Sequence, residues 1–96
     1  MEFVFDSQVV EWRGPAPYFF AAVPDDECDA IREVAAMASY GWGVIPVRAR
    51  IGGVEFETSL FPRDGGYLLP LKVAVRRRLS LAVGDDVAVE MAVKGV

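Results

Sequence analysis

The chain of 96 residues contains no histidine and only one cysteine, Cys28. The lack of histidine removes the most common general base, the most common metal ligand and the usual pH switch near neutrality. A single cysteine cannot build an internal disulfide framework, and it cannot supply the ligands of a zinc finger or ribbon. The composition therefore predicts no catalytic residues, no metal site and no cofactor.

Long apolar runs are also missing. The longest stretch without a charge, residues 34–47, is interrupted by Gly41, Gly43 and Pro46. It falls short of the roughly 20 apolar residues that a membrane-spanning helix needs. The first six residues lack the basic start and apolar stretch of a secretory signal. The sequence predicts a cytoplasmic protein that does not insert into a membrane.

Hydrophobic residues are abundant, at 53% of the chain, against 25% charged residues. This balance is typical of chains that fold around an apolar core, and disordered chains have less hydrophobic and more charged sequence. Ninety-six residues are about the size of one domain. We predict a single domain over residues 1–96.

Charge is distributed unevenly along the chain, although the net charge is only -4. Residues 1–33 carry eight acidic and two basic side chains, whereas residues 48–78 carry seven basic and three acidic ones. A net negative charge disfavours nonspecific binding to DNA, but a local basic face can still hold an anion.

The first half of the chain predicts two strands and a helix. Residues 3–12 and 18–23 are rich in β-formers on either side of a loop with two prolines. From Asp25 the apolar period changes to three and four residues, which indicates an amphipathic helix that ends near Gly41. Its apolar face is expected to contain Cys28, Ile31, Ala35 and Ala38.

A hairpin is the clearest local signal, because Gly52 and Gly53 fit a two-residue turn with positive φ angles. Pairing residue 51 with residue 54 places Ala49 opposite Phe56 on an apolar face. The same register places Arg50 opposite Glu55 and Arg48 opposite Glu57 on the other face.

The second half repeats the plan of the first: strand, turn, strand, proline, helix, glycine turn, strand. We expect a short strand at residues 67–69, a helix opened by Pro70 and a last strand over residues 86–93. The repeated halves, about 2–51 and 54–94, predict a mainly β fold. Its form is a six-stranded closed or double-split barrel of two ββαβ halves, capped by two helices.

Two family resemblances follow from particular motifs. Residues 69–79 with 83–89 resemble the proline, helix and Gly-Asp strand of the swapped-hairpin transcription-factor and antitoxin barrels, which bind DNA as two chains. A closer likeness is carried by Trp12, Phe19, Phe20, Pro24, residues 41–43, 58–62 and 65–70, Lys72, Val75, Arg76, Gly84 and Asp85. In these residues the chain resembles the bacterial family of domains of unknown function numbered nineteen-oh-five. That family occurs alone or ahead of an OmpD-associated, bacteriocin-protection type module. The resemblance implies a small double-split barrel in one chain, without an established activity.

Lys72 and Arg76 are the sharpest candidates for binding, because four-residue spacing places both cations on one helical face, with Tyr67 shortly before them. Such a group can hold a phosphate or carboxylate. Basic residues near a helix C-terminus also simply complement its dipole, which is the more common role.

Two further residues are candidate ligand contacts. Trp42 stands between two glycines after the first helix, and Ser59 lies on the polar face of the hairpin beside Pro46. Packing explains an aromatic residue such as Trp42 more often than ligand binding does. Ser59 lacks a histidine to activate it, so we interpret it as structural.

Three hypotheses on function remain open. The first is a noncatalytic binding or interaction module whose partner is a small molecule, such as a small anion, or a protein. The second is DNA binding through the basic face from Lys72 to Arg78, as in swapped-hairpin barrels, although the net charge disfavours it. The third is an enzyme that uses Lys72, Arg76 and Tyr67 on an anionic substrate. The sequence is compatible with a monomer and with a homodimer.

Overall fold

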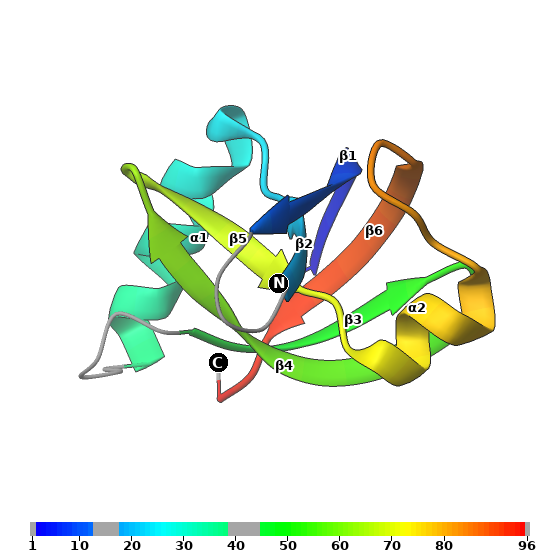
Figure 1. Ribbon diagram of the computed structural model, residues 1–96. Coiled ribbons are helices and arrows are strands. Elements are labelled where there is room, and N and C mark those ends of the chain that lie inside the picture. Colours follow the sequence, from blue (N-terminus) through cyan, green and yellow to red (C-terminus); the bar gives the residue numbers. More distant parts are fainter. Residues whose placement is uncertain (1, 13–17, 39–44, 96) are drawn as a thin grey trace.

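Alternating apolar and polar residues make most of this chain suited to half-buried strands, and these strands close on themselves. The computed structural model describes residues 2–12, 18–38 and 45–95. Its elements are β1 (Glu2–Trp12), β2 (Tyr18–Ala22), α1 (Asp25–Ala38), β3 (Ile45–Ile51), β4 (Val54–Arg63), β5 (Gly66–Pro70), α2 (Val73–Leu79) and β6 (Asp86–Val93). The six strands of these described ranges form a closed antiparallel barrel in the order β1-β2-β5-β4-β3-β6 (Figure 1). The predicted mainly β, six-stranded barrel with two helices is confirmed.

The order strand, strand, helix, strand occurs twice along the chain, first as β1-β2-α1-β3 and then as β4-β5-α2-β6. Two of the three counterpart pairs are hydrogen-bonded neighbours, since β2 pairs with β5 and β3 pairs with β6, and the hairpin β1–β2 corresponds to β4–β5. Exchanging every strand for its counterpart therefore leaves the order around the barrel unchanged. The two helices lie on opposite sides of the barrel (Figure 1).

The hairpin of β3 and β4 has the predicted register. Ile51 pairs with Val54, Ala49 with Phe56 and Arg50 with Glu55. The two turn glycines have φ angles of 55° at Gly52 and 80° at Gly53, as a primed turn requires. The glycine pair thus sets which face of both strands points into the barrel.

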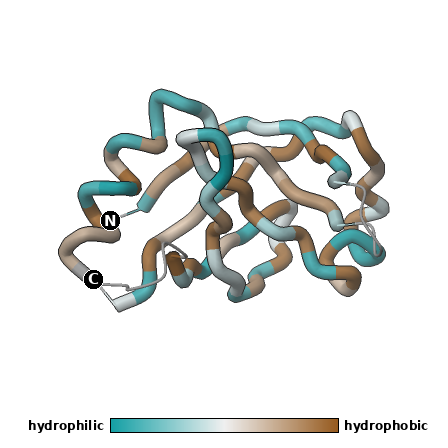
Figure 2. The backbone as a smooth tube through the Cα atoms, turned by 60° about the vertical axis from the view of Figure 1, so that its left-hand side comes forward, coloured by the Kyte–Doolittle hydropathy of each residue, from teal (hydrophilic) through white to brown (hydrophobic). Residues whose placement is uncertain are grey.

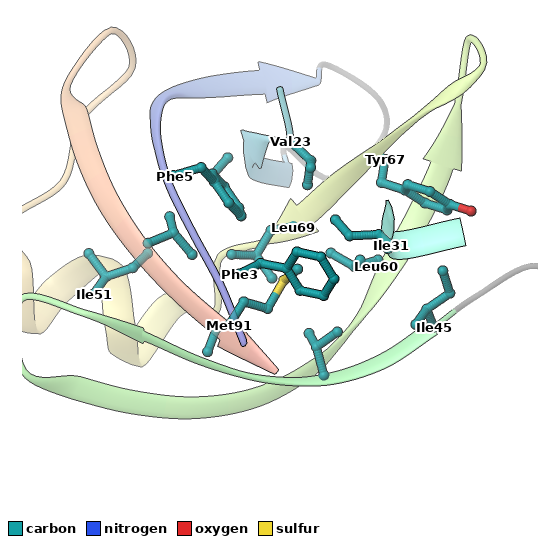
Figure 3. Close-up of a cluster of buried hydrophobic side chains, with 14 of the residues drawn as sticks. Phe3, Phe5, Val23, Ile31, Ile45, Ile51, Leu60, Tyr67, Leu69 and Met91 are labelled. Atoms are coloured by element: carbon teal, nitrogen blue, oxygen red, sulfur yellow. The ribbon is translucent and has the colours of Figure 1, made fainter. Parts of the chain in front are cut away.

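The core inside the barrel is built from side chains at alternating positions along the strands. In Figure 2, hydrophobic and hydrophilic residues follow each other along much of the backbone. In β6 the predicted alternation is confirmed, since Val87, Val89, Met91 and Val93 are all buried. Figure 3 shows side chains from several strands meeting inside the barrel. No buried polar or charged residue lies among those that the structure describes.

Helix α1 closes one side of this core. It begins with the acidic residues 25–27, which favour the positive end of the helix dipole. Cys28, Ile31 and Val34 are buried, and Ile31 points toward the barrel interior (Figure 3). The predicted helix end at Gly41 lies outside the described residues. In the described ranges, neither helix has the length and apolar character needed to cross a membrane.

Helix α2 begins later than the sequence predicts. Pro70 does not open the helix but ends β5, where it pairs with Phe20 of β2. The pairing then continues, because the Leu71 amide donates a hydrogen bond to the Phe19 carbonyl at 2.9 Å. Lys72 keeps an extended backbone, with φ -66° and ψ 150°, and the helix starts at Val73. The gain of strand hydrogen bonds thus outweighs the helix-opening preference of proline.

Candidate functional site

A groove of about 380 Å³ lies between the first residues of β2 and helix α2. Its lining consists of the aromatic residues 18–20, the connection 70–73 and Arg76. The groove exists because the β2–β5 pairing holds residues 70 and 71 against β2 while the short helix turns away from them. This lining contains two cations and no carboxylate, so the groove favours an anionic ligand.

Arg76 is held in this groove by stacking. Its guanidinium carbon lies 3.9 Å from the centre of the Phe19 ring, within the range of a cation–π contact. Its Nε atom is buried and has no hydrogen-bond acceptor in the described residues. No carboxylate of the described ranges forms an ion pair with Arg76. The guanidinium therefore lies against an aromatic ring, and its Nε donor has no partner among the described residues.

Lys72 lies one turn before Arg76, and its carbonyl accepts a hydrogen bond from the Arg76 amide at 3.0 Å. Its side chain lines the same groove and also a neighbouring hollow of about 370 Å³. Glu57 lines that second hollow, where a hydrogen bond from Lys94 lowers the pKa of its carboxyl group. The Lys94 Nζ atom lies 2.6 Å from Glu57 Oε1, so the carboxylate already has a cationic partner other than Lys72.

Tyr67 does not line the groove beside Lys72 and Arg76. It is a buried core residue of β5 whose ring lies 5.7 Å from the guanidinium carbon of Arg32 on α1. Its hydroxyl group points away from the hydrophobic cluster (Figure 3). The three residues of the enzyme hypothesis are thus split between two neighbourhoods of the barrel.

The remaining candidates lie elsewhere. Ser59 is half-buried on β4, opposite Pro46 as predicted, and it does not line the groove. Trp42 lies outside the described residues. In the described ranges, no three acidic or cysteine residues gather as metal ligands would.

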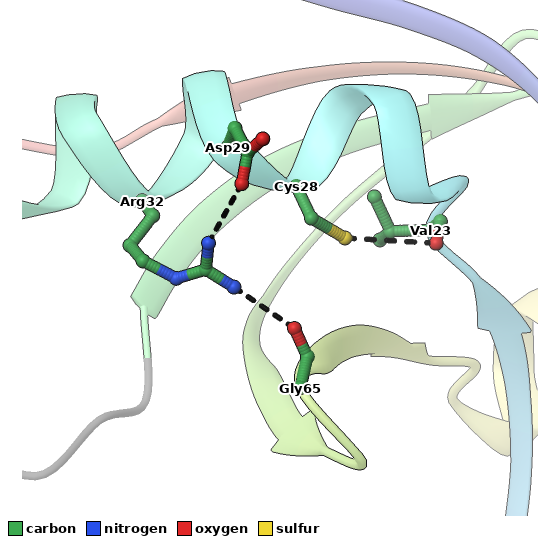
Figure 4. Close-up of polar contacts among 5 residues, drawn as sticks. All are labelled: Val23, Cys28, Asp29, Arg32 and Gly65. Carbon is green, nitrogen blue, oxygen red and sulfur yellow. Dashed lines mark hydrogen bonds and ion pairs between the residues drawn. The ribbon is translucent and has the colours of Figure 1, made fainter.

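On helix α1, by contrast, the arginine has its hydrogen-bond partners within the protein (Figure 4). The Arg32 guanidinium donates hydrogen bonds to Asp29 Oδ1 and to the Gly65 carbonyl, each at 2.9 Å. The Cys28 thiol lies 3.8 Å from the Val23 carbonyl, and burial raises the pKa of this thiol. A raised pKa keeps the sulfur protonated at neutral pH, so Cys28 is not an activated nucleophile.

A third hollow, of about 270 Å³, lies on the outer face of β3 and β6, and its lining mixes arginines with carboxylates. Arg50 Nε lies 2.6 Å from Glu90 Oε2, and this hydrogen bond lowers the pKa of Glu90. The sequence placed Glu55 opposite Arg50, and that register is correct. The ion pair instead forms with Glu90, which faces Arg50 from the neighbouring strand β6.

The aromatic wall of the groove was missed by the sequence analysis. Residues 18–20 were interpreted only as a strand, and Val73 only as part of a helix. Their roles follow from the pairing of β2 with β5, which joins segments 50 residues apart. The sequence offered one signal for this wall, namely three consecutive aromatic residues, Tyr18, Phe19 and Phe20. Because successive side chains of a strand point to opposite faces, at least one of the three must point out of the barrel.

The fold and the groove together define a small closed antiparallel barrel with a cationic, aromatic-lined groove. The family model described as "Domain of unknown function (DUF1905)" matches residues 5–91. The chain therefore belongs to the DUF1905 family, in agreement with the resemblance seen in its sequence. No curated protein matches the chain.

Proposed function

We propose that this protein is a noncatalytic binding module that holds a small anionic ligand in the groove between β2 and α2. The observation that carries the proposal is the state of Arg76. Its guanidinium is oriented by Phe19 and has no acceptor or ion-pair partner in the described residues. A planar fork of N–H donors in a fixed position suits the two oxygens of a carboxylate or phosphate group.

Lys72 supports this assignment because it adds a second positive charge to the same groove. An anion between the two cations gains from both, and a groove with low-dielectric aromatic walls strengthens each interaction. The chain contains no histidine, and the groove lining offers no carboxylate, thiol or serine hydroxyl. These features favour binding without turnover.

The test is a titration of the isotope-labelled full chain with inorganic phosphate and with acetate, followed by amide NMR shifts. We expect saturable shifts at residues 18–20 and 72–79, and a loss of affinity of about tenfold or more in Arg76→Gln, because a charged hydrogen bond is removed. Arg32→Gln is the matched control, since Arg32 is an arginine of the other helix. Shifts that do not saturate, or that are equal in both variants, would contradict the proposal.

Duplex DNA is the second candidate ligand, and the observation that favours it is the exposed pair Arg77 and Arg78 in the last turn of α2. Binding to phosphates through these side chains would weaken steeply as salt rises. A gel-shift or anisotropy titration at low salt tests this candidate. Retention that is lost in Arg77→Gln/Arg78→Gln but kept in Arg76→Gln would favour DNA over the groove ligand.

A further inference from the structure

We infer that the groove ligand is an aromatic anion: a flat apolar ring system that carries one carboxylate or phosphate group. The inference rests on the proposed function and specifies the chemical class of its ligand. It depends on apolar surface beside the two cations, on the ring contacts of Tyr18 and on the position of Arg76.

Apolar surface is exposed on both elements that bound the groove. Tyr18 of β2 is 59% exposed and Val73 of α2 is 51% exposed, and both line the groove. Large hydrophobic side chains at a hollow with converging polar groups are typical of small-molecule sites. A bare inorganic anion would contact Arg76 and Lys72 and would leave both apolar surfaces in water.

The exposed tyrosine belongs to a row of aromatic rings that contact one another. The Tyr18 and Phe20 rings have centroids 6.5 Å apart, and the Phe20 and Trp12 rings have centroids 6.3 Å apart. Phe20 is only 6% exposed although it does not belong to the core cluster inside the barrel. The row therefore places the Tyr18 ring in contact with a neighbouring ring at the edge of the groove.

The orientation of Arg76 selects the geometry of the anion. Phe19 covers the guanidinium at 3.9 Å and the Nε atom is buried, so the edge formed by Nη1 and Nη2 is left to donate hydrogen bonds to a ligand. Carboxylates and phosphates both offer two oxygens that match this edge. An anionic group at Arg76 that is joined directly to a ring system places the ring beside Tyr18 and Val73, which line the same groove. The groove volume of about 380 Å³ is at the lower end for small-molecule sites, which suits one or two fused rings.

The experiment titrates the full chain with three probes, each followed by NMR in the same way: 2-naphthoate, its neutral analogue 2-naphthamide, and acetate. We expect 2-naphthoate to bind about tenfold more tightly than either of the other two, because it alone uses both the cations and the apolar surface. 2-Naphthyl phosphate is a fourth probe, and its affinity relative to 2-naphthoate distinguishes phosphate from carboxylate as the preferred anionic group.

Two variants separate the ring from the charge. Tyr18→Ala is expected to weaken 2-naphthoate about three- to tenfold, as the loss of an aromatic contact does, and to leave acetate unchanged. Arg76→Gln is expected to weaken both. Met37→Ala is the matched control, because Met37 is an exposed apolar residue on the other helix. Tyr18→Phe keeps the ring and should keep the affinity.

The outcomes distinguish the inference from the function on which it rests. Equal affinities for 2-naphthoate and acetate, both lost in Arg76→Gln, would overturn the aromatic inference and leave the anion site standing. Equal affinities for 2-naphthoate and 2-naphthamide, both unaffected in Arg76→Gln, would overturn both. Absence of saturable shifts with every probe would also overturn both.

Discussion

Each helix of the barrel presents one arginine to an aromatic ring, and the two arginines are used differently. Arg32 of α1 lies over Tyr67, and its guanidinium donates hydrogen bonds to Asp29 and to the Gly65 carbonyl. Arg76 of α2 lies closer to its ring, Phe19, but has no acceptor in the described residues. Both guanidinium groups lie against an aromatic ring, but only that of Arg32 has hydrogen-bond acceptors among the described residues.

The surroundings of the two arginines explain the difference. Helix α1 has 14 residues and buries Cys28, Ile31 and Val34 against the barrel, whereas α2 has 7 residues and buries only Val75. A long helix covers its side of the barrel and brings its own acidic residues to the arginine. A short helix covers less, which leaves the groove beside β2. One structural plan thus yields a closed side and an open side.

The largest expected effect concerns packing on the closed side. Ile31→Ala removes a side chain that is fully buried, so we expect a loss of about 2–5 kcal/mol in the free energy of unfolding. Val75→Ala on α2 removes fewer atoms from a less extensive contact, and we expect about 1–2 kcal/mol. Chemical denaturation of both variants measures the difference. Equal losses would contradict the distinction between a closed and an open side.

A smaller effect is expected at the β3–β4 hairpin, where Gly52 faces α2. Its φ of 55° is unfavourable for other residues, and an added Cβ would lie 2.9 Å from Leu79 Cδ2. We expect Gly52→Ala to cost about 1–2 kcal/mol for the backbone, with a further cost as Leu79 shifts. Gly53→Ala is the control, because its φ is also positive but its Cβ would meet open space. Thermal unfolding should place Gly52→Ala below Gly53→Ala in Tm; the reverse order would show that Leu79 does not press on this turn.

For Arg32 and Arg76 we predict opposite rankings in their effects on stability and on anion affinity. Arg32→Gln is expected to lower stability by about 0.5–1.5 kcal/mol, since it loses a hydrogen bond to a backbone carbonyl. Arg76→Gln is expected to lower stability less, because the loss of its stacking is offset by the removal of an unsatisfied Nε. Anion affinity should change in the opposite order. A combined denaturation and titration series tests both, and the same ranking in stability and affinity would contradict our account.

The smallest expected effect is a pH dependence of stability, which arises from two exposed ion pairs of the barrel strands. Hydrogen bonds from Lys94 and Arg50 lower the pKa values of Glu57 and Glu90 below their unfolded values. Groups with lowered folded pKa values stabilise the protein above the unfolded pKa, near 4.3, and this contribution is lost as pH falls through the folded pKa. Both carboxylates are exposed, so the effect is small. Unfolding measured from pH 7 down to pH 3 should decline less in Glu57→Gln/Glu90→Gln than in the original chain; parallel curves would be evidence against these pairs.

The sequence was sufficient for features that depend on near neighbours. The Gly52-Gly53 turn fixed the register of β3 with β4 because a two-residue loop leaves a single alignment that buries the apolar face. The three- and four-residue spacing around Ile31 located α1, since one apolar face recurs with the helical period. The repeated order of elements indicated the barrel, because neither half can bury its sheet alone.

Features that depend on contacts between distant segments could not be predicted from the sequence. The start of α2 shifted from Pro70 to Val73 because the strand pairing of residue 70 with Phe20 continues past the proline. The placement of Arg76 over Phe19 depends on the same pairing, so the sequence indicated a cationic face without its aromatic partner. Tyr67 was grouped with Lys72 by proximity in the chain, but its side chain lies beneath Arg32 of the other helix.

The most direct measurement follows the Nε–Hε resonances of Arg32 and Arg76 in proton–nitrogen correlation spectra while 2-naphthoate is titrated into the protein. We predict that the Arg76 resonance shifts with the same saturation curve as the amides of residues 18–20, while the Arg32 resonance stays in place. An Arg76 resonance that does not move at saturation, or an Arg32 resonance that moves as far, would contradict the claim that one arginine binds ligand and the other holds the fold.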